Sequence, residues 1–263
     1  MPRVRLDVLL VDRGLAPTRA TAQAMLLAGE VEAPAMGTRN LRPGTLVAKD
    51  VELVVRDRRR WASRAGEKLA AALDAFAIDP AGEVALDAGA STGGFTDVLL
   101  ARGVRRVYAV DVGRGQLVDR LRGDPRVVSM ERTNLRTLEG LPEPVQLATL
   151  DLSFISLRLV LPAVRRLLEP HGQVVALVKP QFEAGREAAP RDGVIRDPAT
   201  HARVLQQVGA DAGAAGFGVS GLIRSPILGG DGNVEFLAHL VEPSGMAPEA
   251  LAERIRVVAA PSG

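Results

Sequence analysis

The sequence predicts an α/β fold, in which a doubly wound sheet with an antiparallel last strand follows a small α+β module. Three observations lead to this prediction. Beyond residue 83, short apolar runs alternate with helical patterns, which is typical of a sheet with parallel strands. The last two apolar runs, 217–224 and 234–241, have no helix between them and predict an antiparallel end to that sheet. Residues 3–55 instead contain two short helical patterns followed by short strand-like runs.

The N-terminal module begins with two predicted helices. Residues 3–13 place leucines on one helical face, and Thr18 is a typical N-cap for a second helix over 19–28. Residues 1–64 carry twelve basic and seven acidic side chains, whereas residues 65–263 carry 21 and 24. This distribution predicts a polyanion-binding module ahead of a mildly acidic body, although a solvated basic face would give the same counts. Short strands are expected at Val31, 46–47 and 51–55.

A basic junction follows, reading R-D-R-R-R-W-A-S over 56–63, and it contains the only tryptophan. We expect Trp61 to pack, between the domains or in either core, rather than stack on a base, because tryptophan is mostly a buried anchor. A helix is expected over 64–77, with Lys68 at the edge of its apolar stripe. These features divide the chain into a module at 1–58, a linker at 59–63 and a second domain at 64–263.

The second domain is predicted to alternate strands and helices. Ligands of such sheets bind at the carboxyl ends of the strands. Strands are expected near 84–87, 106–110, 127–130, 147–151 and 173–179. Helices are expected near 95–102, 115–122, 157–169 and 199–214. The polar residues at the strand ends are Asp87, Asp111, Glu131, Asp151 and Lys179.

The stretch 86–95, L-D-A-G-A-S-T-G-G-F, predicts a glycine-rich turn between a strand and a helix. Its glycines lack a Cβ, so the backbone can approach a ligand closely, and the amides that open the helix can face that ligand. It is neither the dinucleotide G-x-G-x-x-G pattern nor a P-loop, since no Gly-Lys-Ser/Thr follows. An acid before such a turn is typical of S-adenosylmethionine enzymes, with a second acid, here Asp111, to hold ribose hydroxyls. An ordinary βα turn without a ligand is the alternative interpretation.

The composition excludes several classes of protein. The chain has no cysteine, which excludes disulfides, thiolate metal sites and enzymes that methylate carbon 5 of a pyrimidine through a cysteine adduct. Its three histidines are far apart, so no metal site is expected. No apolar run approaches the roughly 18 residues of a membrane span, and no signal peptide opens the chain. We therefore expect a cytoplasmic protein without a membrane partner, which argues against a membrane-lytic toxin.

A lysine–carboxylate cluster is expected at the edge of the sheet. Only three of the 33 basic residues are lysines, and a lysine can release its proton near neutral pH where arginine cannot. Asp151 and Lys179 end neighbouring strands, Glu235 begins the last strand, and Lys68 precedes the first. A lysine near other cations can remove the proton of a sugar hydroxyl beside a methyl donor. Two structural salt bridges would use the same four residues, and spacing alone does not separate these interpretations.

The N-terminal module resembles the S-four RNA-binding domain, named after small-subunit ribosomal protein four. The matching residues are R-L-D at 5–7, R-G-L at 13–15, T-R at 18–19, A-G-E-V at 28–31 and R-P-G at 42–44. The loop at 32–40 is longer than the short hairpin turn of that domain. The resemblance implies that the module binds RNA. We expect contacts to phosphates from Arg3, Arg5, Arg19 and Arg42 of the module and from Arg59 and Arg60 of the linker.

The whole chain resembles the TlyA (haemolysin A-like) family, which pairs an S-four domain with a Rossmann-like methyltransferase domain of the FtsJ type. The family's linker, Arg-x-Trp and a small residue, is matched by R-R-W-A at 59–62. The other matching segments, in chain order, are S-R-A-G-E-K-L (63–69), L-D-A-G-A-S-T-G-G-F-T (86–96), D-V-G-R-G-Q-L (111–117), E-R-T-N (131–134), D-L-S-F-I-S (151–156), L-V-K-P-Q-F-E (177–183) and G-N-V-E-F (232–236).

This resemblance implies 2′-O-methylation of cytidine in ribosomal RNA near the subunit interface, with S-adenosylmethionine as the cofactor. The substrate would be the 50S subunit and, as in some members, also the 30S subunit. Two alternatives stay open: a non-catalytic ribosome-assembly factor, and methylation of a base amino group, which D-L-S-F at 151–154 suggests only weakly because it lacks the usual prolines. The implied catalytic tetrad is Lys68, Asp151, Lys179 and Glu235. The implied cofactor-binding residues are Asp87, Gly89, Ala90, Ser91, Gly93, Gly94, Phe95, Asp111, Thr133, Asn134 and Asp151.

Overall fold

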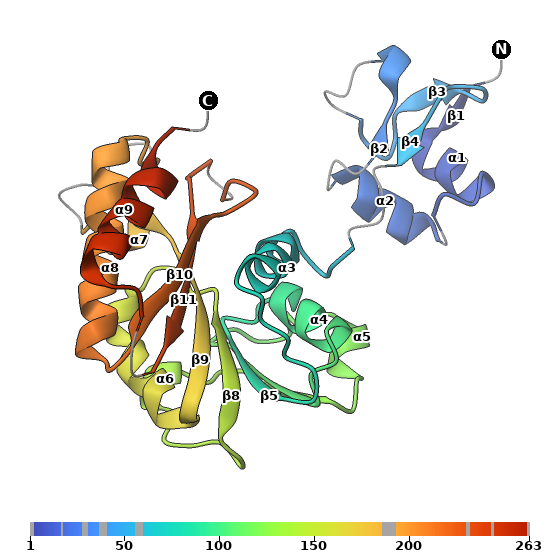
Figure 1. Cartoon of the computed structure of the whole chain (residues 1–263). Coiled ribbons are helices and arrows are strands. Elements are labelled where there is room, and N and C mark those ends of the chain that lie inside the picture. Colours follow the sequence, from blue (N-terminus) through green and yellow to red (C-terminus); the bar gives the residue numbers. More distant parts are fainter. Residues whose placement is uncertain are drawn as a thin grey trace. The chain divides into compact units, whose positions relative to one another are not determined.

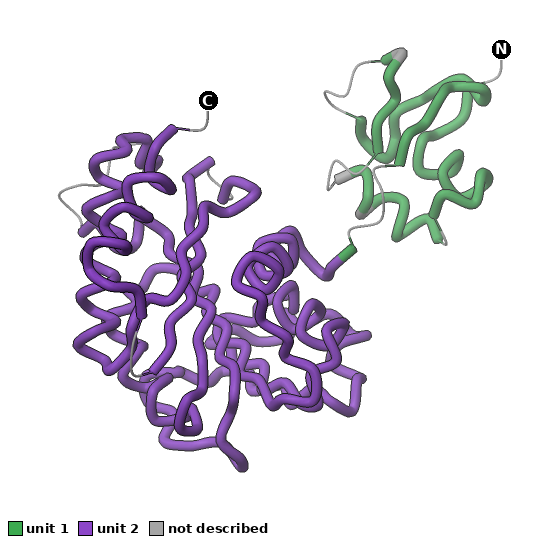
Figure 2. The backbone as a smooth tube through the Cα atoms, in the orientation of Figure 1, with its two compact units in different colours: residues 1–60 green, residues 61–263 purple. Residues whose placement is uncertain are grey.

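The chain folds into two compact units, residues 1–60 and 61–263 (Figure 1, Figure 2). Each unit has hydrophobic core residues of its own. The computed structural model describes residues 3–16, 18–27, 31–36, 41–55, 60–185, 193–229, 232–242 and 245–261.

The N-terminal unit contains two helices and two short pairs of antiparallel strands. β1 pairs with β3, and β2 pairs with β4. Leu6, Leu9 and Leu10 share a core with Ala22 and Leu26, which joins the two helices. The elements of this unit are β1 (Arg3–Arg5), α1 (Leu6–Asp12), α2 (Arg19–Leu27), β2 (Val31–Glu32), a 3₁₀ turn (Pro34–Met36), β3 (Leu46–Ala48) and β4 (Val54–Val55).

The first helix is shorter than the sequence predicts. A helical start at Arg3 was wrong, because residues 3–5 form β1 and the helix begins at Leu6. The R-V-R alternation has the two-residue period of a strand, and Val4 lies opposite Val47 of β3. Pairing with β3 therefore takes precedence over the helical pattern at these residues.

The second unit is built on a seven-stranded sheet with the order β10-β11-β9-β8-β5-β6-β7. Among its described strands, β11 runs antiparallel to both β10 and β9, and the other neighbours are parallel. The predicted α/β fold with an antiparallel last strand is thus confirmed. The strands are β5 (Val84–Ala88), β6 (Arg106–Val110), β7 (Val127–Met130), β8 (Val145–Leu150), β9 (Leu168–Val178), β10 (Gly218–Arg224) and β11 (Phe236–Val241).

Helices cover both faces of this sheet (Figure 1). One face packs against α3, α4 and α5 through residues such as Leu73 and Leu99. The other face packs against α6, α8 and α9 through residues such as Val164, Leu205 and Ile255. The helices are α3 (Ala65–Ala75), α4 (Gly94–Ala101), α5 (Asp119–Arg122), α6 (Leu161–Leu167), α7 (Pro180–Glu183), α8 (Pro198–Ala214) and α9 (Pro248–Ala259).

Three elements differ from the prediction. The helix expected near 115–122 begins only at Asp119. The helix expected up to residue 169 ends at Leu167, because Leu168 already pairs with Val145 of β8 and begins β9. The sequence pattern predicts no element after residue 241, whereas α9 packs on the sheet there. Trp61 is buried in the core of the second unit, as expected. No helix in the described part of the chain is long and apolar enough to cross a bilayer.

Candidate functional site

The glycine-rich turn follows β5 and needs glycine at two positions for different reasons. Gly89 has φ +84°, and a Cβ at this position would lie 2.4 Å from the backbone oxygen of Asp151. Gly93 has φ +97°, and a Cβ there would lie 2.3 Å from the Leu121 side chain. The first glycine lets the end of β8 approach the turn, and the second lets α5 pack on it.

Asp111, at the end of β6, holds the turn from the neighbouring strand. Its Oδ2 accepts a hydrogen bond from the Ser91 amide at 2.8 Å, and its Oδ1 accepts one from the Gly113 amide at 2.7 Å. Ser91 has φ +46°, an uncommon conformation for a residue with a side chain. Each carboxylate oxygen can accept a further hydrogen bond, so Asp111 keeps acceptor capacity for a ligand.

A cavity of about 490 Å³ lies at this edge of the sheet. Six of the predicted cofactor-binding residues line it: Gly89, Ser91, Asp111, Thr133, Asn134 and Asp151. Ala90, Gly94 and Phe95 line a smaller cavity of about 190 Å³, which shares Gly89, Ser91 and Asp151 with the first. Asp87 and Gly93 line neither of these two cavities.

Asp87 instead lies below the turn and supports it. The side chain is fully buried, and the hydroxyl groups of Thr96 and Thr149 donate to its carboxylate at 2.6 and 3.4 Å. Burial raises the Asp87 pKa to about 7, the charge of Asp151 adds to this increase, and the Thr96 hydrogen bond opposes it. Asp87 therefore links β5 to the first turn of α4 and does not face the cavity.

The four predicted tetrad residues form two ion pairs. The Lys68 ammonium group of α3 contacts Glu235, and both side chains are buried. Lys179 Nζ lies 2.6 Å from Asp151 Oδ1 and donates to Ser153 Oγ at 3.0 Å. Phe236 pairs with Val178 across β11 and β9, so Glu235 and Lys179 occupy the ends of adjacent strands.

Two anchoring residues were missed by the sequence analysis. Glu183 of α7 accepts hydrogen bonds from Ser156 Oγ at 2.7 Å and from the Leu157 amide at 2.9 Å. Burial raises the pKa of Glu183. The contacts join the segment after Lys179 to the segment after Asp151. Ser156 and Glu183 are the last residues of two segments that resemble the TlyA family, 151–156 and 177–183, and this was the sequence signal that could have identified them.

Asn233 is the second anchor, and it holds the segment that leads into Glu235. Its Oδ1 accepts a hydrogen bond from the Ile195 amide at 2.9 Å, and its Nδ2 donates to the Gly193 oxygen at 3.0 Å. Asn233 is buried, so these contacts satisfy its amide. Residues 230 and 231 of the same loop lie outside the described residues.

Phe154 was also missed as part of the site. It lines the larger cavity, is 90% exposed and has φ +62°. Its ring lies 5.0 Å from the ring of Phe182. A positive φ is rare for a bulky residue. In this conformation the Phe154 ring is exposed to solvent beside the cavity.

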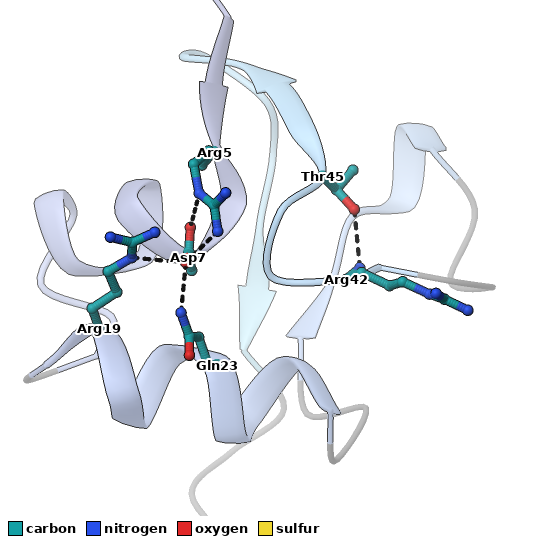
Figure 3. A network of polar contacts seen from close by, with 6 residues as sticks. All are labelled: Arg5, Asp7, Arg19, Gln23, Arg42 and Thr45. Atoms are coloured by element: carbon teal, nitrogen blue, oxygen red, sulfur yellow. Dashed lines mark hydrogen bonds and ion pairs between the residues drawn. The ribbon is translucent and has the colours of Figure 1, made fainter.

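Among the predicted RNA-binding arginines that the structure describes, Arg5 and Arg19 meet at one carboxylate. Arg5 and Arg19 both contact Asp7, whereas the Arg42 side chain points away from it (Figure 3). Arg3 is exposed on β1. Arg60 is exposed at the end of the unit, and Arg59 lies outside the described residues.

Comparisons with known proteins agree with this geometry. Residues 61–241 match the model of the FtsJ-like methyltransferases. A Mycobacterium tuberculosis protein named 16S/23S rRNA (cytidine-2′-O)-methyltransferase TlyA is 47% identical over 242 residues, which cover 90% of each chain. YqxC of Bacillus subtilis, a candidate rRNA methyltransferase by name, is 49% identical over 91% of this chain and 86% of its own.

A solved structure also covers both units of the chain. A candidate hemolysin from Streptococcus thermophilus has a TM-score of 0.75 and 45% sequence identity, and the match covers 98% of this chain and 96% of that one. The resemblance to TlyA proteins expected from the motifs is confirmed. This chain belongs to the FtsJ-like methyltransferase family.

Proposed function

We propose that this protein transfers a methyl group from S-adenosylmethionine to the 2′-oxygen of a cytidine ribose in ribosomal RNA. One observation carries the proposal: Asp151 lines the cavity beside the glycine-rich turn and forms an ion pair with Lys179. The name of the M. tuberculosis relative supports the choice of substrate. An rRNA substrate, in the 50S and also the 30S subunit, implies that the protein works in the cytoplasm.

The cavity fits the proposed cofactor. Its volume of about 490 Å³ lies within the range of ordinary small-molecule sites. Asp111 would accept hydrogen bonds from ribose hydroxyls, and Gly89 and Ser91 line the same cavity. Thr133 and Asn134 would lie by the adenine. S-adenosylmethionine supplies a methyl group on a sulfonium, which is already activated for transfer.

The tetrad would provide proton transfer and charge stabilisation. Nζ of Lys179 would accept the proton that the 2′-hydroxyl loses when its oxygen takes the methyl group. Lys68 would stabilise the negative charge that develops on the oxygen. Asp151 and Glu235 hold the two lysines in position, and alignment of the reacting atoms would supply most of the rate.

Two features support RNA as the substrate. The N-terminal unit, proposed as an S-four-like RNA-binding domain at 1–58, exposes Arg3, Arg5 and Arg19. In the second unit, Phe154 presents an exposed ring beside the cavity, and aromatic rings are common stacking surfaces for unpaired bases. No metal enters this proposal, and no group of three or more acidic or histidine side chains in the described residues could hold one.

The deciding experiment supplies labelled S-adenosylmethionine with isolated 30S subunits, 50S subunits or naked rRNA and then maps the modified bond. A label at a cytidine ribose that protects its bond from alkali would support the proposal. A label on a base amino group, with the bond still cleavable, would show base methylation instead. Cofactor binding without transfer to any of the three would favour an assembly factor.

Lys179→Ala should abolish transfer while cofactor binding survives, because the proton acceptor is lost and the cavity remains. The measurement is single-turnover methyl transfer at saturating subunits, with calorimetry of S-adenosylhomocysteine binding. Lys49→Ala is the matched control, since Lys49 belongs to neither ion pair; its turnover at saturating RNA should equal that of the wild type. Normal transfer by Lys179→Ala would reject Lys179 as the base.

A further inference from the structure

A fully buried carboxylate lies beneath two exposed arginines of the N-terminal unit. Asp7 is 0% exposed, whereas the side chains of Arg5 and Arg19 are 44% and 55% exposed. Arg5 donates from Nε to Asp7 Oδ1 and from Nη2 to Oδ2, each at 3.0 Å. Arg19 Nε and Gln23 Nε2 both donate to Oδ2 at 2.9 Å (Figure 3).

The partners of Asp7 keep it charged despite its burial. The hydrogen bonds from Arg5 have the largest effect and hold the Asp7 pKa well below its ordinary value, and those from Gln23 and Arg19 act in the same direction. A carboxylate between two guanidinium groups reduces their mutual repulsion. Asp7 thereby allows two arginines, one from β1 and one from α2, to stay close together.

Backbone hydrogen bonds fix the position of Asp7 at the start of α1. The Asp7 amide donates to the Pro43 oxygen at 3.2 Å, and the Leu6 amide donates to the Thr45 oxygen at 2.9 Å. The first turn of α1 is therefore joined to the turn at 43–45. The position of Asp7 is set by the fold of the unit, and the arginines take their orientation from Asp7.

Each guanidinium uses only part of its hydrogen-bonding capacity in this contact. Arg5 Nη1 and both Nη atoms of Arg19 make no hydrogen bond to Asp7. Paired guanidinium donors with fixed orientation suit a phosphate group, which accepts several charge-assisted hydrogen bonds at once. We propose that Arg5 and Arg19 form one site for a phosphodiester of the RNA and that Asp7 is its positioning residue. This inference rests on the proposed action on RNA.

Arg42 provides the contrast within the same unit. Its amide donates to Thr45 Oγ1 at 3.0 Å, and its side chain points away from Asp7 (Figure 3). Arg42 can contact RNA, but Asp7 does not orient it. The effect of a substitution at Asp7 on RNA affinity should therefore depend on the presence of Arg5 and Arg19 and not on the presence of Arg42.

The sign of one affinity change tests the proposal. Asp7→Asn removes a negative charge from an RNA-binding unit, and by charge alone binding to RNA would tighten. If Asp7 positions the arginines, binding should instead weaken by roughly tenfold, because two long side chains lose their fixed orientation. Asp50→Asn is the matched control: Asp50 is exposed in the same unit, and its loss changes the charge equally without touching Arg5 or Arg19. Its binding should stay equal or tighten slightly.

A double-mutant cycle separates positioning from a folding defect. Binding of the full-length chain to isolated 50S and 30S subunits is measured at one salt concentration, with thermal unfolding alongside. In an Arg5→Ala/Arg19→Ala background, Asp7→Asn should weaken binding no further, whereas in an Arg42→Ala background the full weakening should remain. Equal weakening in both backgrounds, or tightening as with Asp50→Asn, would overturn the proposal.

The proposed methyl transfer is tested independently of this site. At saturating subunits, Asp7→Asn should leave kcat unchanged and raise only KM, because the site contributes to binding and not to chemistry. If the Arg5→Ala/Arg19→Ala chain binds subunits as well as the wild type, the phosphate site is rejected while methyl transfer stands. If the wild type transfers no methyl group, the proposed function fails whatever the affinity of these variants.

Discussion

Two aspartates, Asp7 in the N-terminal unit and Asp87 in the second unit, are both 0% exposed, yet their pKa values shift in opposite directions. Asp7 receives hydrogen bonds from two arginines and an amide, and its pKa lies well below the ordinary value. Asp87 receives hydrogen bonds from two hydroxyl groups, and burial raises its pKa to about 7. Loss of solvent favours the neutral acid in both cases, and at Asp7 the hydrogen bonds from Arg5, Gln23 and Arg19 outweigh that preference.

The difference matches what each unit is proposed to do. Asp7 is buried, but the guanidinium groups that it contacts reach solvent, so its charge organises a surface. Asp87 lies inside a sheet with helices on both faces, and the nearby carboxylate of Asp151 disfavours a second charge. Asp87 holds Thr96 and the turn, and Lys179 is the partner of Asp151.

The largest expected effect is a pH-dependent stability of the second unit. An acid whose pKa is raised on folding binds more protons in the folded state, so its contribution to the free energy of unfolding falls as pH rises. For a shift from 3.8 to about 7, this loss amounts to roughly 3 kcal/mol between pH 5 and pH 8. Denaturant titrations of wild type and Asp87→Asn should therefore diverge, with the variant gaining relative stability as pH rises.

The control for this titration is Asp119→Asn, whose carboxylate is 99% exposed. Its stability should follow the wild type at each pH. Parallel curves for the wild type and Asp87→Asn would mean that Asp87 is ionised throughout, and the contrast with Asp7 would disappear.

The sequence predicts where the site lies better than which atoms meet there. Asp151 and Lys179 could be placed together because they end two consecutive strands of a parallel sheet, and such ends share one edge. Glu235 depended on a further inference, that β11 inserts beside β9, and the structure shows this insertion. The pairing of Lys68 with Glu235 required the packing of α3 on the sheet, which no local pattern encodes.

Asp87 shows most clearly that the sequence does not predict the direction of a side chain on a buried strand. It was predicted to bind the cofactor because it ends a strand just before the turn. All five residues of β5 are buried, since helices cover both faces of the sheet, so no alternation in the sequence tells which face a side chain takes. For Asp7, the R-L-D motif was visible, but its contacts with Arg19 and Gln23 depend on how α1 packs against α2.

A smaller effect is expected when Asp87 loses a hydroxyl partner. Thr96→Val keeps the shape of the side chain and removes the 2.6 Å hydrogen bond to the carboxylate. We expect a loss of about 2 kcal/mol in the free energy of unfolding at pH 8, where Asp87 is charged, and a smaller loss at pH 5.5. Thr137→Val is the control, because its exposed hydroxyl donates only to the backbone oxygen of Asn134 at 3.2 Å. An equal loss for Thr96→Val at both pH values would contradict a titrating Asp87.

The smallest expected effect is in the N-terminal unit and concerns how much Arg5 and Arg19 each lower the Asp7 pKa. Arg5→Ala removes two hydrogen bonds from Asp7 and Arg19→Ala removes one, so both should raise the Asp7 pKa, and Arg5→Ala should raise it more. Both changes should be modest, because water screens guanidinium groups that are half exposed. Titration of the Asp7 carboxyl carbon by NMR measures the difference directly. A larger rise for Arg19→Ala would mean that α2, rather than β1, keeps Asp7 ionised, and Arg19 would then be the arginine that the buried carboxylate holds most firmly.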